Sequence, residues 1–534
     1  MKKWSMICVF VIAVAILTAC GAEKYEILTP QTLHDVIDIA ALRREAIVKP
    51  DYSTILSLTE GRNREDFFRM SIFYCHTHLP RSTRPYITIY DAISDMWSLH
   101  RLMRQKYGGY VYFGGDDVFI PLFEALEAEL LGYGCDVIAE FFGIKGDEIT
   151  PEAFAAILRW RLNAVINDVH FRIYNGSLSW GYGFFHSLAC VYDRSDRGFI
   201  NRKTGLLLTA IEGHEIEDIM KLHVDYDGRL FYSPVFIYAP FHELLFDDAL
   251  YDFIVIYQEE LDTPKFHAYF VYEDMEPVSR IFTEKEIEFD FEKTTPLPSL
   301  EFIDGIPVVT VMVMGFDGSE ISHGFEHVAP FLSFAEYLCD EPVVIVDLRG
   351  NEGGNGHLPT RWLYMLTGEM VWPNYVSLGT MPFFLGSLLF RDAPYAQKFM
   401  FNQERLDCGH VKRNFGPREI VERDQLLIVL TDRWTGSAGE GFVDAVFNIT
   451  NTLVIGTPTR GVLAFDMTYP HLRLPETSIP FGFGTTMNVW PEGHFAESVG
   501  ILPDLWVEGD ALVAALALLR GAGFGDEIIG GLYE

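Results

Sequence analysis

The sequence predicts an α/β layer structure for its C-terminal part, preceded by a helical region and a β-rich region. Three patterns predict this order. Apolar residues recur at helical spacing over 56–169, strand-like segments dominate 170–300, and strand-like and helix-like segments alternate over 301–534. With 534 residues, the chain also exceeds what one hydrophobic core usually serves, so several domains are expected.

The N-terminus carries the pattern of a secretory signal peptide. Lys2 and Lys3 precede an apolar run, Ile7 to Leu17, that is too short to span a bilayer comfortably. Small residues follow it and lead to Cys20, so residues 1–19 are predicted to be a cleaved signal.

The segment Leu17-Thr18-Ala19-Cys20-Gly21 resembles the lipobox of bacterial lipoproteins. That resemblance implies cleavage before Cys20 and a diacylglycerol group on its sulfur; the alternative is an ordinary signal peptide in which this cysteine has no role. On the first reading, residues 20–55 are a lipid-anchored tether, and the protein faces outward from a bacterial membrane within the cell envelope.

The composition excludes some partners. A net charge of −34 argues against nucleic acid and anionic membrane surfaces, because both require clustered Lys and Arg. Five cysteines follow the predicted signal peptide and Cys20, and none form a Cys-x-x-Cys pair, so buried free thiols are expected rather than a metal or redox site. They stand at 75, 135, 190, 339 and 408.

Two regions precede the α/β part. In the first, Phe123 to Leu131 and Pro151 to Ile166 have the apolar spacing of helices. In the second, Gly205 to Ile211 and Phe266 to Tyr272 are typical of strands. Residues 205–220 are loosely similar to a peptide-binding PDZ-like module, but no convincing carboxylate-binding loop is found there, so such a module is degenerate or absent.

The first chemically informative unit lies at 342–359. Pro342 to Leu348 is a continuous apolar run, as a buried strand should be. It leads into Arg349-Gly350-Asn351-Glu352-Gly353-Gly354-Asn355-Gly356, and a helix-like stretch begins at Pro359. The glycines allow a sharp bend whose N–H groups can bind negative charge. Because the spacing does not fit a dinucleotide or phosphate loop, an oxyanion hole is the better interpretation.

The second unit contains the candidate nucleophile. Gln425 to Leu430 is typical of a buried strand, and apolar residues at helical spacing follow from Phe442. Ser437 lies between them, where its hydroxyl can face a cleft at a helix N-terminus. The alternative role for this serine is a helix cap.

Together the two units resemble peptidase family S41. Asp347 to Gly354 resembles the Asp-Leu-Arg-x-Asn-x-Gly-Gly segment of that family, and Thr435 to Glu440 resembles its Thr-x-Ser-Ala-x-Glu nucleophile motif. Gly500-Ile501-Leu502-Pro503-Asp504 is similar to its Gly-Val-x-Pro-Asp strand. The three motifs stand in the same order as in the family.

The resemblance implies a crotonase-like core of stacked strand–strand–helix units. It implies that Ser437 attacks the scissile carbonyl and that the N–H groups of Gly353 and Ala438 stabilise the oxyanion. It also implies polypeptide substrates, in extended or C-terminal segments of envelope proteins. The alternative function is a catalytically silent relative that binds a peptide or an apolar ligand.

The identity of the general base must differ from that in the tail-specific branch of the family, which uses a Ser-Lys dyad. Val462 stands here where that lysine would be, and Arg460 cannot accept a proton at neutral pH. The branch that resembles the tricorn core takes a histidine from upstream, and Asp168-Val169-His170 resembles its Asp-x-His segment.

His170 is therefore the predicted base, because neutral imidazole accepts a proton near pH 7. Glu497 is the acid predicted to orient it, and Asp168 is a weaker candidate because it reaches the ring poorly. Four other histidines remain open as the base: His323, His327, His357 and His494. No metal site and no cofactor are expected, since His76-Thr77-His78 lacks a partner at metal spacing and no His-Glu-x-x-His occurs.

Overall fold

The computed structural model describes thirteen stretches of the chain: 26–48, 85–132, 147–174, 176–178, 183–186, 190–238, 265–283, 297–314, 324–379, 411–413, 418–466, 472–484 and 486–525. The predicted signal peptide, Cys20 and the His76-Thr77-His78 segment lie outside these residues. Within them, no helix combines the length and the apolar character that a membrane crossing requires.

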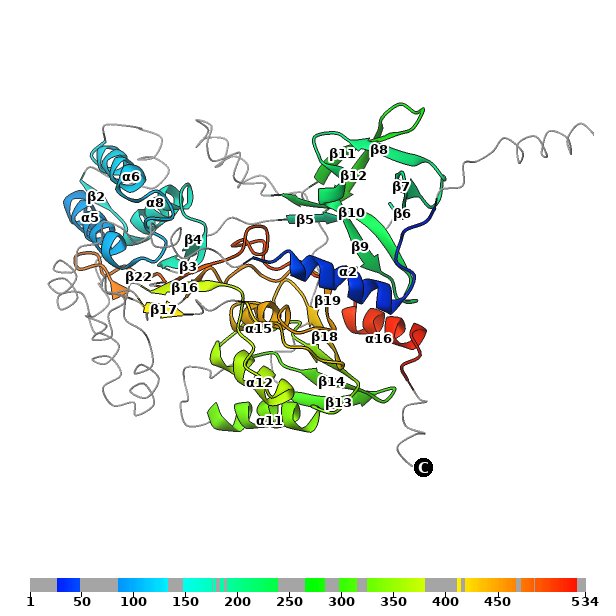
Figure 1. Cartoon of the computed structure of the whole chain (residues 1–534). Coiled ribbons are helices and arrows are strands. Elements are labelled where there is room, and N and C mark those ends of the chain that lie inside the picture. The colour runs from blue at the N-terminus through cyan, green and yellow to red at the C-terminus, as the bar shows by residue number, and fades with distance from the viewer. Residues whose placement is uncertain are drawn as a thin grey trace, which may run out of the picture.

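A large sheet passes through most of the described chain, and its C-terminal half is mainly parallel (Figure 1). Strands β14, β15, β18, β19 and β24 are parallel neighbours, and β13 closes the edge in an antiparallel hairpin with β14. The apolar runs predicted to be buried strands are β15 and β18, and every residue of both is buried. The bounds are β13 Ser299–Ile303, β14 Ile306–Thr310, β15 Val343–Asp347, β18 Leu426–Thr431, β19 Thr452–Gly456 and β24 Leu505–Trp506.

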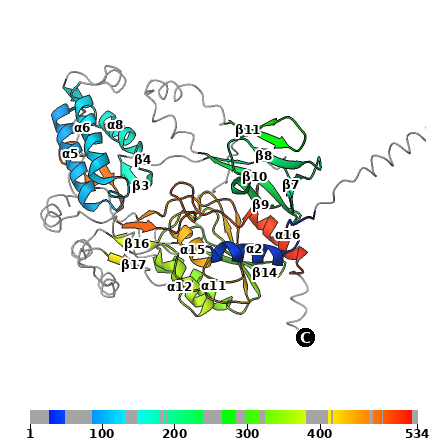
Figure 2. The same cartoon turned by 45° about the horizontal axis from the view of Figure 1, so that its top comes forward.

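Helices cover both faces of this parallel part. On one face, α11, α12 and α15 pack against Val344 and Val346 of β15. On the other, α2 and α16 pack against Val343 and Ile345, which point the opposite way along the same strand. Figures 1 and 2 show α2 and α16 side by side on that face. The bounds are α2 Leu33–Glu45, α11 Gly324–Tyr337, α12 His357–Thr367, α15 Ala438–Val446 and α16 Ala511–Gly521.

The β-rich region extends the same sheet. Its strands are antiparallel, and β9 joins the parallel part through the pairing of His223 with Trp506. A short helix, α9 (Ile216–Ile219), packs near β9 and β10, and β5 pairs with β10 beside the main path. The bounds are β5 Gly183–His186, β6 Tyr192–Ser195, β7 Gly198–Asn201, β8 Leu207–Ile211, β9 Met220–Val224, β10 Leu230–Tyr238, β11 Lys265–Tyr272 and β12 Val278–Thr283.

The helical region stands apart from the large sheet at the left of Figure 1. Thr88 and Thr150 cap its helices by accepting hydrogen bonds from the backbone N–H groups of Asp91 and Ala153. Helices α5, α6 and α8 share one core with β3, whereas β1 pairs with β2 and β4 pairs with β3. The bounds are β1 Ile87–Thr88, α5 Ile89–Lys106, α6 Gly115–Leu130, β2 Glu148–Ile149, α8 Pro151–Asn163, β3 Asp168–Ile173 and β4 Gly176–Leu178.

A late segment of the chain returns to this helical region. Phe465, Phe481 and Met487 belong to the same core as α5, α6 and α8. They lie on short strands, of which β22 pairs with β3 and β23 pairs with β16 and β20. The bounds are β16 Val376–Gly379, β17 Val411–Arg413, β20 Phe465–Asp466, β21 Leu472–Arg473, β22 Pro480–Gly482 and β23 Thr486–Val489.

The predicted α/β class agrees with this mixed fold and its large sheet. The predicted domain limits remain a prediction. Two contacts cross them, because α2 lies inside the predicted tether at 20–55 and packs on the parallel part, while 465–487 packs with the helical region. The path of the chain thus brings β3 and the predicted base to the edge of the α/β part.

Candidate active site

The two glycine-containing bends lie side by side because β15 and β18 are parallel neighbours, which places their carboxyl ends at one edge of the sheet. The Asp432 carboxylate fastens the bends together by accepting a hydrogen bond from the N–H of Gly350, at 3.0 Å from each of its oxygens. Thr435 Oγ1 donates to the carbonyl of Leu348 at 2.8 Å. The N–H of Gly436 donates to the carbonyl of Asn351 at 2.7 Å.

Ser437 lies where the sequence predicted it, between β18 and α15. Its side chain is partly exposed, and it stands immediately before the first residue of the helix. Its φ is +48°, a conformation that non-glycine residues rarely adopt. Such strain persists only where the surrounding structure holds the residue in place, and it concentrates at functional sites.

Gly353 packs directly against this serine. Its φ is +103°, and a Cβ added there would lie 2.6 Å from Ser437 Cβ and 3.0 Å from Ala438 N. The predicted bend therefore does face the predicted nucleophile, and only glycine permits the approach.

The two predicted oxyanion donors differ in their availability. The N–H of Gly353 already donates to Asn351 Oδ1 at 2.9 Å, an interaction that the sequence did not predict. The N–H of Ala438, at the first position of α15, has no acceptor among the described residues. An exposed neighbour of Gly353, Gly354, likewise donates to no described residue. Ala438 is thus free to bind an oxyanion as the helix begins.

Glu440 supports the nucleophile, a role that its place in a sequence motif did not indicate. Its carboxylate is fully buried and accepts the backbone N–H of Ser437 at 3.0 Å. It also accepts from three groups of the loop after β19: Thr459 Oγ1, Gly461 N and Val462 N. The loop is thereby fastened to the turn that carries Ser437.

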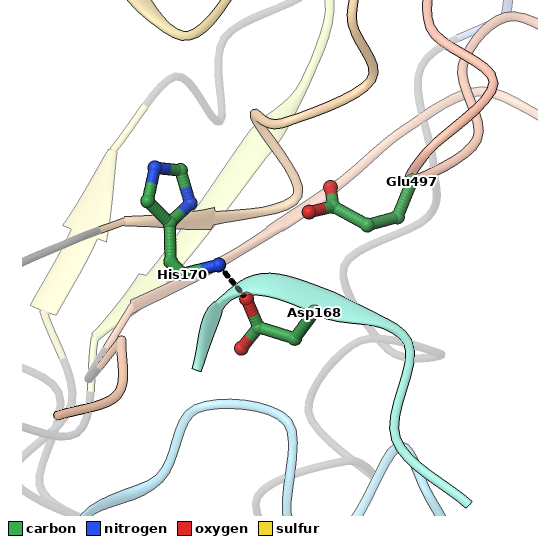
Figure 3. A group of neighbouring side chains, drawn as sticks. All are labelled: Asp168, His170 and Glu497. Atoms are coloured by element: carbon green, nitrogen blue, oxygen red, sulfur yellow. Dashed lines mark hydrogen bonds between the residues drawn. The ribbon is translucent and has the colours of Figure 1, made fainter. Parts of the chain in front are cut away.

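The predicted base and its two candidate partners form one cluster, drawn in Figure 3. One carboxylate oxygen of Asp168, one ring nitrogen of His170 and one carboxylate oxygen of Glu497 all lie within 4.8 Å of one another. Asp168 Oδ1 accepts the backbone N–H of His170 at 2.8 Å, so this carboxylate holds the strand rather than the ring. The Glu497 carboxylate points towards the histidine and accepts hydrogen bonds from the backbone N–H groups of Val169 and Ala464.

The imidazole is buried and incompletely paired. Only 8% of His170 is exposed, and its Nδ1 atom has no hydrogen-bond partner. No hydrogen bond joins the ring to Glu497 or to Ser437 within the described part of the chain. The predicted orienting contact is therefore an approach within 4.8 Å and not a hydrogen bond.

Burial sets the protonation of this cluster. It lowers the pKa of His170 to about 4, helped by the positive charges of Arg172 and Arg460. It raises the pKa of Asp168, and it raises the pKa of Glu497 well above the usual range, with the charge of Asp168 adding to the effect. At neutral pH the imidazole is consequently uncharged and able to accept a proton.

The loop over residues 457–465 contacts both the turn that carries Ser437 and the cluster that contains His170. At one end, the Cδ of Arg460 lies 3.3 Å from the position that a Cβ on Gly436 would take. At the other, the N–H of Ala464 donates to Glu497 Oε2 at 2.9 Å. Ser437 and His170 thus flank one loop, although they come from segments far apart in the sequence.

The other predicted histidines are placed differently. His494 is buried and its Nε2 lies 2.7 Å from Asp444 Oδ1, so this ring is engaged at the far end of α15. His357 is exposed at the start of α12. His323 and the side chain of His327 lie outside the described residues. Of the predicted free thiols, Cys190 is buried and Cys339 half-buried, and both are unpaired.

Among the described residues, Asp168, His170 and Glu497 also form a group of the side-chain types that bind metal ions. Zn²⁺ requires bonds of about 2.0–2.2 Å to nitrogen and oxygen, so the three side chains would have to draw closer together to bind it. Both carboxylates already accept backbone hydrogen bonds. The arrangement fits proton transfer better than metal binding.

Residues 339–507 match the model of peptidase family S41. No curated protein matches the chain significantly. Mature CPAF complexed with lactacystin is a similar solved structure, with 12% identity and a TM-score of 0.41 over 81% of this chain and 97% of that one.

Two further solved structures are similar to the chain. The photosystem II D1 C-terminal processing protease has 13% identity and a TM-score of 0.33, over 78% of this chain and 93% of that one. The tricorn protease has 13% identity and a TM-score of 0.30, over 80% of this chain and 37% of that one.

Proposed function

This chain belongs to peptidase family S41 and is a serine peptidase, and we propose that it cleaves peptide bonds with Ser437 as nucleophile and His170 as general base. The observation that carries the proposal is the setting of Ser437. The serine is held at positive φ at the start of α15, against a glycine bend and beside a free helix N–H.

The proposed reaction proceeds in two halves. Ser437 Oγ bonds to the scissile carbonyl carbon while its proton passes to the neutral His170 ring. The oxygen that becomes negative is stabilised by the N–H of Ala438, with Gly353 as the second donor once its bond to Asn351 is exchanged.

Breakdown of the tetrahedral intermediate cleaves the C–N bond, and the imidazolium gives its proton to the leaving amine. Water then attacks the acyl-enzyme by the same steps, releasing the carboxylic acid and restoring Ser437. Glu497 lies close enough to orient the ring and to stabilise its charged form.

The proposed substrates are extended or C-terminal segments of envelope proteins. The family resemblance supports this class, as it supports a crotonase-like core of repeated strand–strand–helix units. A lipobox-like segment ending at Cys20 supports an extracytoplasmic protein anchored to a bacterial membrane by lipid. Replacing Cys20 by alanine should abolish incorporation of labelled palmitate, and unchanged labelling would remove the basis for the anchor.

The peptidase proposal is tested on the full chain in detergent. Denatured casein and a fluorogenic peptide library should be hydrolysed, and a fluorophosphonate probe should label Ser437. Ser437→Ala should abolish both signals, whereas His170→Ala should lower them strongly. A chain that is inert to casein, peptides and the probe, yet retains a bound peptide or apolar ligand, would establish the carrier function instead.

A further inference from the structure

Arg460 lies next to the nucleophile without a role in the proposed chemistry. Its Cβ and Cδ lie 3.5 and 3.3 Å from the position of a Cβ on Gly436, the residue before Ser437. Its backbone N–H donates to the carbonyl of Thr435 at 2.8 Å, which fixes the start of the side chain against the nucleophile turn. Its charge also reaches the ring of His170, whose pKa it helps to lower.

The guanidinium of Arg460 has no carboxylate within ion-pair distance among the described residues. Two other arginines near the nucleophile turn are satisfied by the protein. Arg433 donates to three backbone carbonyls, and Arg349 binds both Asp347 and Asp510. Arg460 instead lies over the ring of Trp434, at 5.7 Å from its centroid.

Trp434, which contacts the Arg460 guanidinium, is accessible to solvent. The side chain is 39% exposed although it stands three residues before the nucleophile. Its ring contacts the guanidinium by a cation–π interaction, and no hydrogen bond joins the Arg460 side chain to another described residue.

The positive charge of Arg460 contrasts with the strongly negative net charge of the chain. With a net charge of −34, the surface repels anionic peptides at long range. A partly exposed arginine beside the proposed nucleophile places a positive charge within this negative surface potential. A guanidinium binds a carboxylate through two parallel hydrogen bonds, which carry more energy and direction than one neutral bond.

We infer that Arg460, supported by Trp434, binds a carboxylate of the substrate close to the scissile bond. The inference rests on the proposed peptidase function and specifies its substrate class: peptides with a negative group near the cleaved bond. That group is an Asp or Glu side chain or the C-terminal carboxylate itself, and the two sources share the same recognition chemistry.

The test uses matched peptides that differ only in this charge. One series is amidated at its C-terminus and exchanges Glu for Gln at each of three positions on either side of the cleaved bond. The second contains only Gln and has either a free or an amidated C-terminus. Wild-type kcat/KM should favour one charged member by about tenfold or more, as expected for a hydrogen bond to a charged group.

Arg460→Met should bring that ratio close to one, and Arg460→Lys should leave an intermediate ratio because lysine keeps the charge but loses the fork. Arg361→Met is the matched control. Arg361 is exposed on α12, and its loss should leave the preference unchanged. The series that shows the preference identifies the source of the carboxylate.

Binding to Ser437→Ala gives a reading that does not depend on catalysis. Fluorescence polarisation with the same peptides should show the same preference, and adding Arg460→Met should remove it. Equal affinity for charged and neutral peptides, or a preference that survives Arg460→Met, overturns the inference. Failure of the peptidase proposal is distinct, because it would appear as the absence of hydrolysis and of fluorophosphonate labelling.

Discussion

The carboxylate of Glu440 holds the backbone of Ser437 in place. It accepts the serine N–H at 3.0 Å from within the first turn of α15. The same buried carboxylate accepts three hydrogen bonds from Thr459, Gly461 and Val462. One side chain therefore fixes both the unusual φ of the nucleophile and the loop that lies between it and His170.

Glu440→Gln is expected to abolish most activity and to destabilise the protein. The amide nitrogen of glutamine would face N–H groups that now donate to a carboxylate oxygen, so at least one buried donor would lose its acceptor. Such a loss costs about 1–3 kcal/mol, and more when a charged group was involved. Thermal unfolding and peptide hydrolysis measure the two effects.

Thr459→Val provides the control for Glu440. It removes one of the four hydrogen bonds to the carboxylate, together with the bond that Thr459 Oγ1 accepts from the Ile501 N–H, and leaves the bond from Ser437 intact. It should retain more activity than Glu440→Gln, even where the two variants lose similar stability. If the two variants lose activity equally, the hydrogen bond from the Ser437 N–H to Glu440 is not what positions the nucleophile.

Gly353→Ala should inactivate the enzyme while leaving it folded. The added Cβ would meet Ser437 Cβ at 2.6 Å, so the bend or the nucleophile must shift by about 1 Å. Displacement on that scale costs on the order of 100-fold in rate. Hydrolysis and the rate of fluorophosphonate labelling should therefore both fall strongly, with circular dichroism retained.

Two other glycines separate the causes of that loss. Gly356 lies in the same bend with open space around it, and Gly213 has a positive φ with open space. Alanine at 356 tests the position without clash or strain, and alanine at 213 tests strain alone. Activity in Gly353→Ala equal to that of these two variants would show that the bend does not shape the nucleophile's setting.

His170 should lower the free energy of unfolding as the pH falls from 6.5 to 4. The folded pKa is about 4, below the usual value of about 6.5, so in this window the unfolded chain binds a proton that the folded chain refuses. The contribution of the neutral ring is complete above pH 6.5 and is lost as the pH falls towards 4. The loss amounts to at most about 3 kcal/mol.

Asp168 and Glu497 act in the opposite direction. Their pKa values are raised, so the folded chain holds protons that the unfolded chain has released, and their contribution favours folding as the pH falls. Comparing His170→Gln with the wild type isolates the histidine. Between pH 6.5 and 4 the unfolding temperature of the variant should fall less than that of the wild type. Parallel pH curves would contradict a buried neutral imidazole.

Local features of the site could be predicted from the sequence. Uninterrupted apolar runs indicated β15 and β18, and glycines after the first run indicated the bend that meets Ser437. These features depend on neighbouring residues, so a short pattern contains the information. The serine at the strand-to-helix corner was predictable for the same reason.

Contacts between distant segments could not be predicted in this way. Glu440 accepts from residues about twenty positions later, and nothing in its own motif indicates which loop returns to it. Likewise, Phe465 and Phe481 look like ordinary strand residues of the C-terminal part, yet they complete the core of α5, α6 and α8. Apolar periodicity shows that a face is buried but not what covers it.

The Gly-Ile-Leu-Pro-Asp motif also has a structural role that its sequence did not indicate. The buried carboxylate of Asp504 accepts hydrogen bonds from Arg43 and Arg44 of α2, at 3.2 and 2.7 Å, and from the N–H of Val454. The Arg44 side chain is only 8% exposed. This ion pair fastens the helix of the predicted tether to the parallel sheet.

Asp504→Asn is therefore expected to destabilise the protein by about 3–5 kcal/mol, because it leaves the buried charge of Arg44 without a counterion. Asp304→Asn is the control. Asp304 pairs with Arg520 at the surface, with side chains 40% and 55% exposed, and such pairs contribute about 0–1 kcal/mol. Thermal unfolding compares the two variants. A similar small loss in both would mean that the ion pair adds no net stability and that α2 is held by its other contacts, which include the apolar side chains of Leu33, Val36 and Ala40.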